Sequence, residues 1–191
     1  MARATPPAPW TVEDFLAWER EQQERYEFFD GLIRMMVGGT ADHNRIAGRV
    51  FAALLAKLRG GPCSVFIEGM KVAGATATMY PDVAVTCSPV DATTDVLPEP
   101  VIVFEILSRS THTFDRGQKW LAYQGIPSLR QYVLISQDEL RVEVYDRRDN
   151  SWVYQALTES DARLMLAVGN IELTMAEIYE DSALDPRTLR A

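Results

Sequence analysis

Apolar residues recur along this chain in two periods, which predict a mixture of helices and strands. Ile46, Val50, Leu54 and Leu58 fall on one wide helical face, so a helix over residues 43–58 is expected to pack on a sheet. Short apolar runs rich in β-branched residues predict strands at 64–72, 80–86, 101–108 and 132–135. One mixed sheet flanked by helices, in the α/β or α+β class, accounts for this order of elements.

Two extra β-hairpins are expected beside this sheet. Asp30-Gly31 lies between two β-prone runs within residues 26–37, and both central positions of such a turn favour a positive φ. A polar turn at 146–150 separates the alternating run 140–145 from 152–157, which predicts a second hairpin at the sheet margin. Further helices are expected from Thr11, over 111–123 and over 173–179.

The totals indicate an ordinary globular chain with an acidic balance. Its 191 residues, 47% of them hydrophobic, suit a single domain over residues 11–191 behind a flexible arm at 1–10. No apolar run is long enough to span a bilayer. Cys63 and Cys87 lack metal-like spacing, so a reduced, cytoplasmic protein is expected. The net charge of −8 disfavours a protein that coats nucleic acid through a basic surface.

Two carboxylates stand in strands that are otherwise apolar. Glu105 lies within Val101–Ser108 and Asp82 within Tyr80–Thr86. A buried carboxylate needs a partner or a raised pKa. If the two strands are neighbours, their alternation lets both acids point to the same side of the sheet. Such a pair suits a hard divalent ion such as Mg²⁺, which takes oxygen ligands from one or two carboxylates, water and phosphate.

Other polar residues are open to two interpretations. Asp115 and Lys119 are four residues apart on a predicted helix, a spacing that by itself favours a helix salt bridge over a catalytic cation. The pattern around Glu27 favours a surface position on a half-exposed strand. His43, in the first turn of a helix, is by pattern more typical of a structural or solvent-facing residue than of a metal ligand.

Taken in order, several segments resemble the Uma-two family, restriction-endonuclease-like proteins of bacteria in the PD-(D/E)XK nuclease superfamily. The resemblance spans residues 11–180. The segments that carry it are Tyr26–Gly31, His43, Pro81–Val85, Phe104–Ser108, and Asp115 with Lys119 and Tyr123 before Gly125-Ile126-Pro127. The combination of Pro-Asp, Glu-Ile-Leu-Ser and Asp-x-x-x-Lys-x-x-x-Tyr is more specific than any of its parts.

The resemblance implies a restriction-endonuclease-like core and a Mg²⁺ (or Mn²⁺) site at Asp82 and Glu105, joined by the carbonyl of Ile106. The superfamily lysine normally stands two residues after the glutamate, where this chain has Leu107. The family shares that departure, which points to Lys119 as the catalytic lysine. The resemblance also implies accessory positions near the site, at Glu27, His43 and Asp115.

Three functional hypotheses follow. The first is a metal-dependent endonuclease acting on DNA, in which Arg45, Arg49 and Arg116, the metal or a partner subunit offsets the acidic surface. The second is a non-catalytic binding or assembly module on the same fold, recruited through an exposed hairpin or the strand of Trp152. The third treats Asp82 and Glu105 as structural acids paired with Lys119. A homodimer is compatible with the exposed edges of the hairpin and the late strands.

Overall fold

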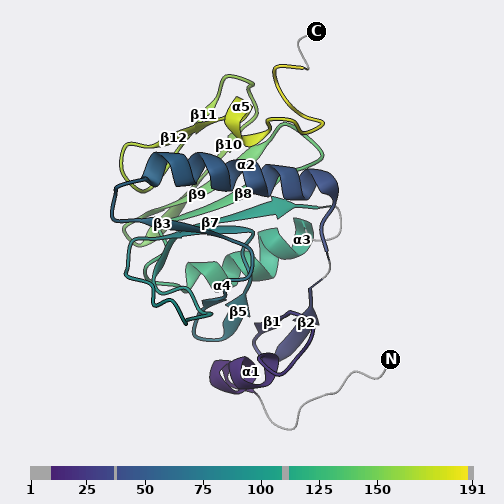
Figure 1. The fold of residues 1–191 in the computed structure, drawn as a ribbon, viewed down its shortest axis with the longest axis vertical. Helices are drawn as coiled ribbons and strands as arrows, with labels where there is room; N and C mark the ends of the chain where they lie inside the picture. The colour runs from purple at the N-terminus through teal and green to yellow at the C-terminus, as the bar shows by residue number, and fades with distance from the viewer. Residues whose placement is uncertain (1–9, 37, 109–111, 189–191) are drawn as a thin grey trace.

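A computed structural model describes residues 10–36, 38–108 and 112–188 of the chain. Its centre is a six-stranded mixed sheet (Figure 1). In spatial order the strands are β10 (Ser151–Leu157), β9 (Val142–Arg148), β8 (Gln131–Ser136), β7 (Pro100–Leu107), β6 (Val83–Thr86) and β3 (Ser64–Ile67). Only β7 and β8 run parallel, and the other neighbours are antiparallel. The predicted α+β class with a mixed sheet is therefore confirmed.

Helices cover both faces of this sheet (Figure 1). Helix α2 (Ala41–Leu58) begins at the N-cap Thr40 and packs Ile46, Val50 and Leu54 against one face. The other face is covered by a broken helix made of α3 (His112–Phe114), the π-helical η1 (Asp115–Lys119) and α4 (Trp120–Gln124). The prediction of a continuous α-helix over 111–123 is wrong for residues 115–119, which are π-helical. Thr111 lies outside the described residues.

A second sheet of four short strands joins the core beside α4 (Figure 1). Its order is β2 (Leu32–Met35), β1 (Tyr26–Phe29), β5 (Ala77–Met79) and β4 (Val72–Ala73). Asp30 and Gly31 have φ values of 45° and 88°, which confirms the expected turn between β1 and β2. Helix α1 (Val12–Glu19) stacks Phe15 on Phe28 of this hairpin.

The C-terminal part adds a small layer over α2. A two-stranded sheet of β11 (Arg163–Met165) and β12 (Glu172–Thr174) leads into α5 (Met175–Ile178). The helix expected over 173–179 is thus shorter, because Leu173 and Thr174 belong to β12. Leu173, Met175 and Ile178 complete the core on the α2 side of the large sheet.

The two cysteines are bonded to each other, contrary to the expected reduced pair. The antiparallel register of β3 and β6 aligns Ser64 with Thr86, so Cys63 and Cys87 follow as the next cross-strand neighbours and form a disulfide. The arm expected at 1–10 lies outside the described residues except for Trp10, whose ring centroid is 5.4 Å from that of Trp18. In the described ranges, no helix has the length and hydropathy to cross a bilayer.

Candidate active site

Glu105 is a buried acid on the central strand β7. Its neighbours Phe104 and Ile106 point into the core under α2, so strand alternation turns Glu105 to the opposite face, beneath η1 and α4. Only 3% of the residue is exposed. Its carboxylate accepts a hydrogen bond at Oε1 from the Tyr123 hydroxyl (2.9 Å) and one at Oε2 from Lys119 Nζ (3.0 Å). The helix above the sheet therefore holds both oxygens of this acid.

Lys119 is the hub of a buried charge cluster. Its Nζ lies 3.0 Å from Oε2 of Glu105, 3.0 Å from Oε1 of Glu27 and 3.8 Å from Oδ1 of Asp115. The predicted pair with Asp115 exists, but it is buried rather than solvated. Both residues belong to the π-helical η1, a rare local form that is often found at functional sites.

Asp82 immediately precedes β6, which begins at Val83. Because Val83 pairs with Phe104 on the antiparallel strand β7, Asp82 continues that register by one residue. It therefore sits opposite Glu105, as strand alternation predicts. Its Oδ2 accepts a 2.7 Å hydrogen bond from the backbone N–H of Ile106 and lies 3.3 Å from Nε2 of His43. Both contacts use Oδ2, so within the described ranges Oδ1 remains available to a ligand.

His43 reaches Asp82 from the first turn of α2. A Cβ at Gly39 would lie 2.7 Å from Nδ1 of His43, so the absence of a side chain there lets the loop pass close to the ring. Burial lowers the pKa of His43, but the hydrogen bond and charge of Asp82 outweigh it and raise the pKa overall. The sequence pattern favours a structural or solvent-facing histidine, whereas the structure places His43 beside Asp82 at the cleft.

Glu27 is buried, so the surface position favoured by its pattern is wrong. Only 5% of the residue is exposed, because β1 turns this side chain toward Lys119. Its Oε1 also accepts a hydrogen bond from the backbone N–H of Tyr80 (3.2 Å). Glu27 therefore links the small sheet to the charge cluster, at the position that the family resemblance gave for an accessory residue.

These side chains line one cleft of about 150 Å³. Its acidic and permanently cationic lining residues are Glu27, Asp82, Glu105, Asp115, Arg34 and Lys119. Acids therefore outnumber the permanent cations, and the local potential is negative. Tyr123 and Arg34 were not singled out from the sequence as site residues. The aromatic residue four after Lys119 was the available signal for Tyr123, whereas nothing in the pattern around Arg34 marks it.

Burial and the surplus of acids shift the pKa values of the buried pair Glu105 and Lys119. Burial, together with the charges of Asp82, Asp115 and Glu27, raises the pKa of Glu105 well above its ordinary value despite the opposing effect of Lys119. Burial alone would lower the pKa of Lys119, but the surrounding carboxylates, Glu105 foremost, raise it well above the usual lysine value. The lysine thus stays protonated in a site that has more acids than cations.

The donor set of this cleft fits a hard divalent cation. In the described part of the chain, no three Asp, Glu, His or Cys side chains are arranged to hold a metal by themselves. Mg²⁺ commonly uses only one or two carboxylates and completes its shell with water and phosphate oxygens. Asp82 and Glu105, crowded among further acids, are the residues that could hold such an ion, and the excess negative charge favours it.

The three arginines expected to offset the acidic charge are each paired with carboxylates. Arg45 pairs with Asp42, Arg116 with Glu143, and Arg49 with Glu180 and Asp181. Neutralisation by these acids removes most of the attraction that the guanidinium groups would offer to phosphate. Arg45, Arg49 and Arg116 therefore do not form a free cationic surface.

The mixed sheet and its covering helices form a restriction-endonuclease-like fold. The fold has a TM-score of 0.75 with a crystal structure described as "a putative nuclease belonging to DUF820 from Anabaena variabilis ATCC 29413". The match covers 90% of this chain and 98% of that one at 18% identity, a likeness that concerns the fold.

The chain belongs to the Uma2 family, whose model, described as "Putative restriction endonuclease", matches residues 12–176. Two uncharacterized proteins of Synechocystis sp. (strain ATCC 27184 / PCC 6803 / Kazusa) are similar to it. One, slr1290, is 34% identical over 176 residues, covering 88% of this chain and 93% of that protein. The other, sll1609, is 30% identical over 160 residues, covering 81% and 90%. The resemblance to the Uma-two family is thereby confirmed.

Proposed function

We propose that the protein is a metal-dependent endonuclease that hydrolyses phosphodiester bonds of DNA. The observation that carries the proposal is the meeting of Asp82, Glu105 and Lys119 in one cleft of a restriction-endonuclease-like fold. A structural ion pair would need one acid for one lysine, whereas this lysine has several acids around it. The surplus of carboxylates supports a site that binds a cation together with an anionic substrate.

The residues have distinct roles in this proposal. Asp82 and Glu105 would hold Mg²⁺ or Mn²⁺, which would supply positive charge and a more acidic water molecule. Lys119 keeps its proton, orients the attacking water and stabilises the negative charge that develops on the phosphate. Tyr123 holds the second oxygen of Glu105, and the Ile106 N–H fixes the Asp82 carboxylate. Fixed side chains of this kind reduce the reorganisation that accompanies the reaction.

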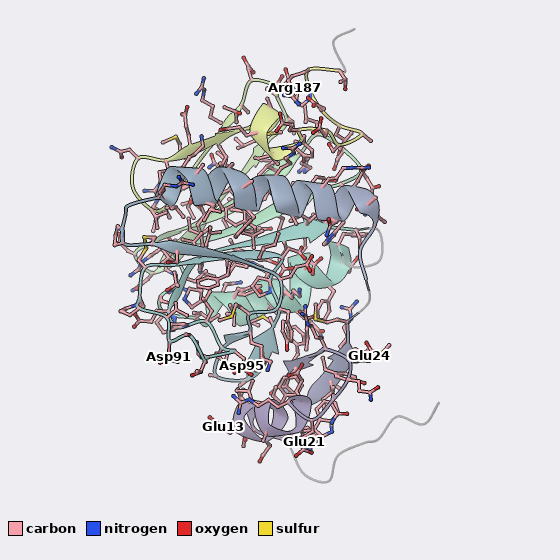
Figure 2. All side chains as sticks on the ribbon, viewed as in Figure 1. Glu13, Glu21, Glu24, Asp91, Asp95 and Arg187 are labelled. Carbon is pink, nitrogen blue, oxygen red and sulfur yellow. A yellow bond between two sulfur atoms is a disulfide. The ribbon has the colours of Figure 1, made fainter. Side chains whose placement is uncertain are left out.

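DNA must meet this protein at the cleft rather than over a broad surface. The net charge is −8. Figure 2 shows Glu13, Glu21, Glu24 and Asp91 at the end of the molecule that carries α1, with Arg187 at the opposite end. An acidic end repels a polyanion, so affinity depends on the local cations of the cleft and on the metal.

The test is cleavage of supercoiled plasmid DNA with Mg²⁺ or Mn²⁺ and with EDTA. We expect nicking by the wild type only with the metal, and a loss of at least about a hundredfold in Asp82→Asn, Glu105→Gln and Lys119→Gln. Glu159→Gln, an exposed acid outside the cleft, is the matched control and should cleave like the wild type. Metal-dependent nicking that survives Glu105→Gln and Lys119→Gln would refute the residue assignment.

A second candidate is an assembly module, supported by the edge strand β10. This strand is the free margin of the large sheet, and its sequence Ser151–Leu157 contains no charged side chain. Val153 and Tyr154 are 50% and 48% exposed, whereas Trp152 is half-buried and packs on Trp120. Natural edge strands usually carry charges or prolines that block pairing.

We propose that a second copy of this chain pairs along β10 to form a homodimer. Two copies of this uncharged strand can pair antiparallel without placing like charges opposite each other. The contact uses the same surface on both subunits, so two-fold symmetry gives a closed dimer. Light scattering after gel filtration should give twice the chain mass, and Val153→Lys should give the monomer. A monomeric wild type at micromolar concentration contradicts the dimer. Calorimetry separates the two functions, because the absence of divalent-ion binding at millimolar metal would favour the assembly module.

A further inference from the structure

Two arginines at the cleft differ from most other cations of the protein. Lys57, Lys71 and the arginines at 20, 45, 49, 116, 141, 163 and 187 form ion pairs with carboxylates. Among the described residues, Arg25 and Arg34 form none, although the protein is acidic overall. Neither guanidinium group is committed to a carboxylate of the described residues, so its N–H donors are available to a ligand.

The hairpin places both guanidinium groups on the side of Glu27. In the β1–β2 register Glu27 is opposite Arg34, so their side chains leave the same face. Arg25 precedes Glu27 by two residues and its carbonyl accepts from Met36 N–H, which continues the ladder. Strand alternation thus sends Arg25, Glu27 and Arg34 toward one face. That face looks onto the charge cluster, because Glu27 contacts Lys119.

Aromatic rings hold these two guanidinium groups. The Cζ of Arg34 lies 4.1 Å from the ring centroid of Phe114, and the Cζ of Arg25 lies 5.7 Å from that of Tyr80. A cation over an aromatic ring is oriented by the ring quadrupole without losing its N–H donors to an acid. The rings thus orient Arg34 and Arg25 while their N–H donors stay free of ion pairs with the described carboxylates.

The two arginines lie along a trench made of two adjoining cavities. The cleft of about 150 Å³ contains Glu105 and Arg34, and a neighbouring cavity of about 350 Å³ contains Arg25. The cavities share Met36, Gly38, Gly39, His43, Tyr80 and Asp82 in their linings. Asp82 therefore sits where they join, with Arg34 lining one part and Arg25 the other.

We propose that this trench binds the sugar–phosphate backbone of a polynucleotide strand, with Arg34 and Arg25 each contacting a phosphate that flanks the one to be cleaved beside Asp82 and Glu105. The inference rests on the proposed nuclease function and names the residues that position its substrate. A guanidinium group recognises phosphate oxygens through paired N–H donors. Glu24 and Glu68 also line the cavity that contains Arg25, but neither forms an ion pair with Arg25. These acids lower the affinity of the cavity for phosphate without occupying the guanidinium group.

The experiment measures binding without cleavage. Full-length protein carrying Glu105→Gln is titrated in EDTA onto a fluorescein-labelled DNA duplex and onto one labelled strand of it, at several salt concentrations. Arg25→Ala and Arg34→Ala should each weaken binding roughly tenfold and lower the slope of log affinity against log salt by about 1. Arg34→Lys, which keeps the charge, should recover the salt slope but not the full affinity.

Arg59→Ala is the matched control. Arg59 is an exposed arginine with no ion pair among the described residues, and it follows the far end of the 18-residue helix α2 from His43. Its removal should change neither affinity nor salt slope. The inference is overturned if Arg25→Ala and Arg34→Ala bind like the parent, or if the parent shows no salt-dependent binding to either DNA. Failure of the proposed function looks different: the arginine variants would lose binding as expected, while the wild type would not cleave with any divalent metal.

Discussion

The Nζ of Lys119 lies 3.0 Å from Oε2 of Glu105, although fourteen positions separate the two residues in sequence. Leu107, which stands two residues after Glu105 on the same strand, is only 3% exposed and packs in the core. A lysine at that position would extend from the same face of β7 as the acid. In this protein the helix above the sheet brings the ammonium group to the glutamate instead.

Replacing Lys119 should destabilise the fold strongly. Lys119→Gln removes the cation that two buried carboxylates contact at 3.0 Å, and unpaired buried charges are costly. We expect a loss of about 3 kcal/mol in the free energy of unfolding, measured in urea at neutral pH. Lys57→Gln removes a partly exposed pair with Glu177 and should cost less than about 1 kcal/mol. Equal losses for the two variants would contradict the role of Lys119 as the hub.

Neutralising Glu105 should have the opposite effect in metal-free protein. Burial and the neighbouring acids raise the pKa of the Glu105 carboxyl, so Glu105→Gln, which removes the charge, should unfold at a higher temperature in EDTA. We expect a gain of about 1 kcal/mol and the loss of any stabilisation by added Mg²⁺. A variant less stable than the wild type in EDTA would instead support a structural acid paired with Lys119.

Asp95 should make stability depend on acid pH at the α1 end. Its hydrogen bonds from Arg20 and Lys71 lower the pKa of this carboxyl, so its contribution is full above the ordinary aspartate pKa and is lost as the pH falls through the lowered value. Asp95→Asn should cost about 1 kcal/mol near neutrality, since the side chain is 38% exposed and its charge pairs are screened.

Urea unfolding near neutrality and near pH 3 checks the sign of that effect. The difference between wild type and Asp95→Asn should shrink on acidification. Asp149→Asn, in the turn between β9 and β10, is the control and should show no such trend. A difference that grows toward acid pH would exclude the charge pairs with Arg20 and Lys71 as the cause.

The disulfide should contribute measurably to stability. Cys63 and Cys87 are 24 positions apart, and closing a loop of that size restricts the unfolded chain by about 3 kcal/mol. The double variant Cys63→Ser, Cys87→Ser should therefore unfold at lower urea concentration, and dithiothreitol should shift the wild type in the same direction. A reductant that also shifts the serine variant would show an effect unrelated to this bond.

Strand alternation predicted that Asp82 and Glu105 point to one face if their strands are neighbours, and the pairing of β6 with β7 meets that condition. Each acid interrupts an apolar run, and two such runs of opposite direction became the adjacent strands β6 and β7. The Asp30-Gly31 turn and the apolar face of α2 were predictable for the same reason, because local sequence fixes them. Local periodicity thus located the large sheet and half of the site.

The features that sequence patterns missed depend on contacts between distant segments. Glu27 has an ordinary strand pattern, and its burial results from the docking of the hairpin against η1. The π-helical turn of η1 depends on packing over the sheet, where helical periodicity predicts an ordinary α-helix. The disulfide follows from the register of β3 and β6, which the spacing of two cysteines does not reveal.

The single ammonium group of Lys119 touches Glu27 from the small sheet and Glu105 from the large one. Glu27 and Arg34 line the cleft from the small sheet and Glu105 lines it from the large one, so the cleft is complete only after the two sheets have docked. A nascent or partly unfolded chain accordingly lacks the complete cleft that the proposed hydrolysis requires. Completion of tertiary folding thus acts as a built-in safeguard on the proposed hydrolytic activity.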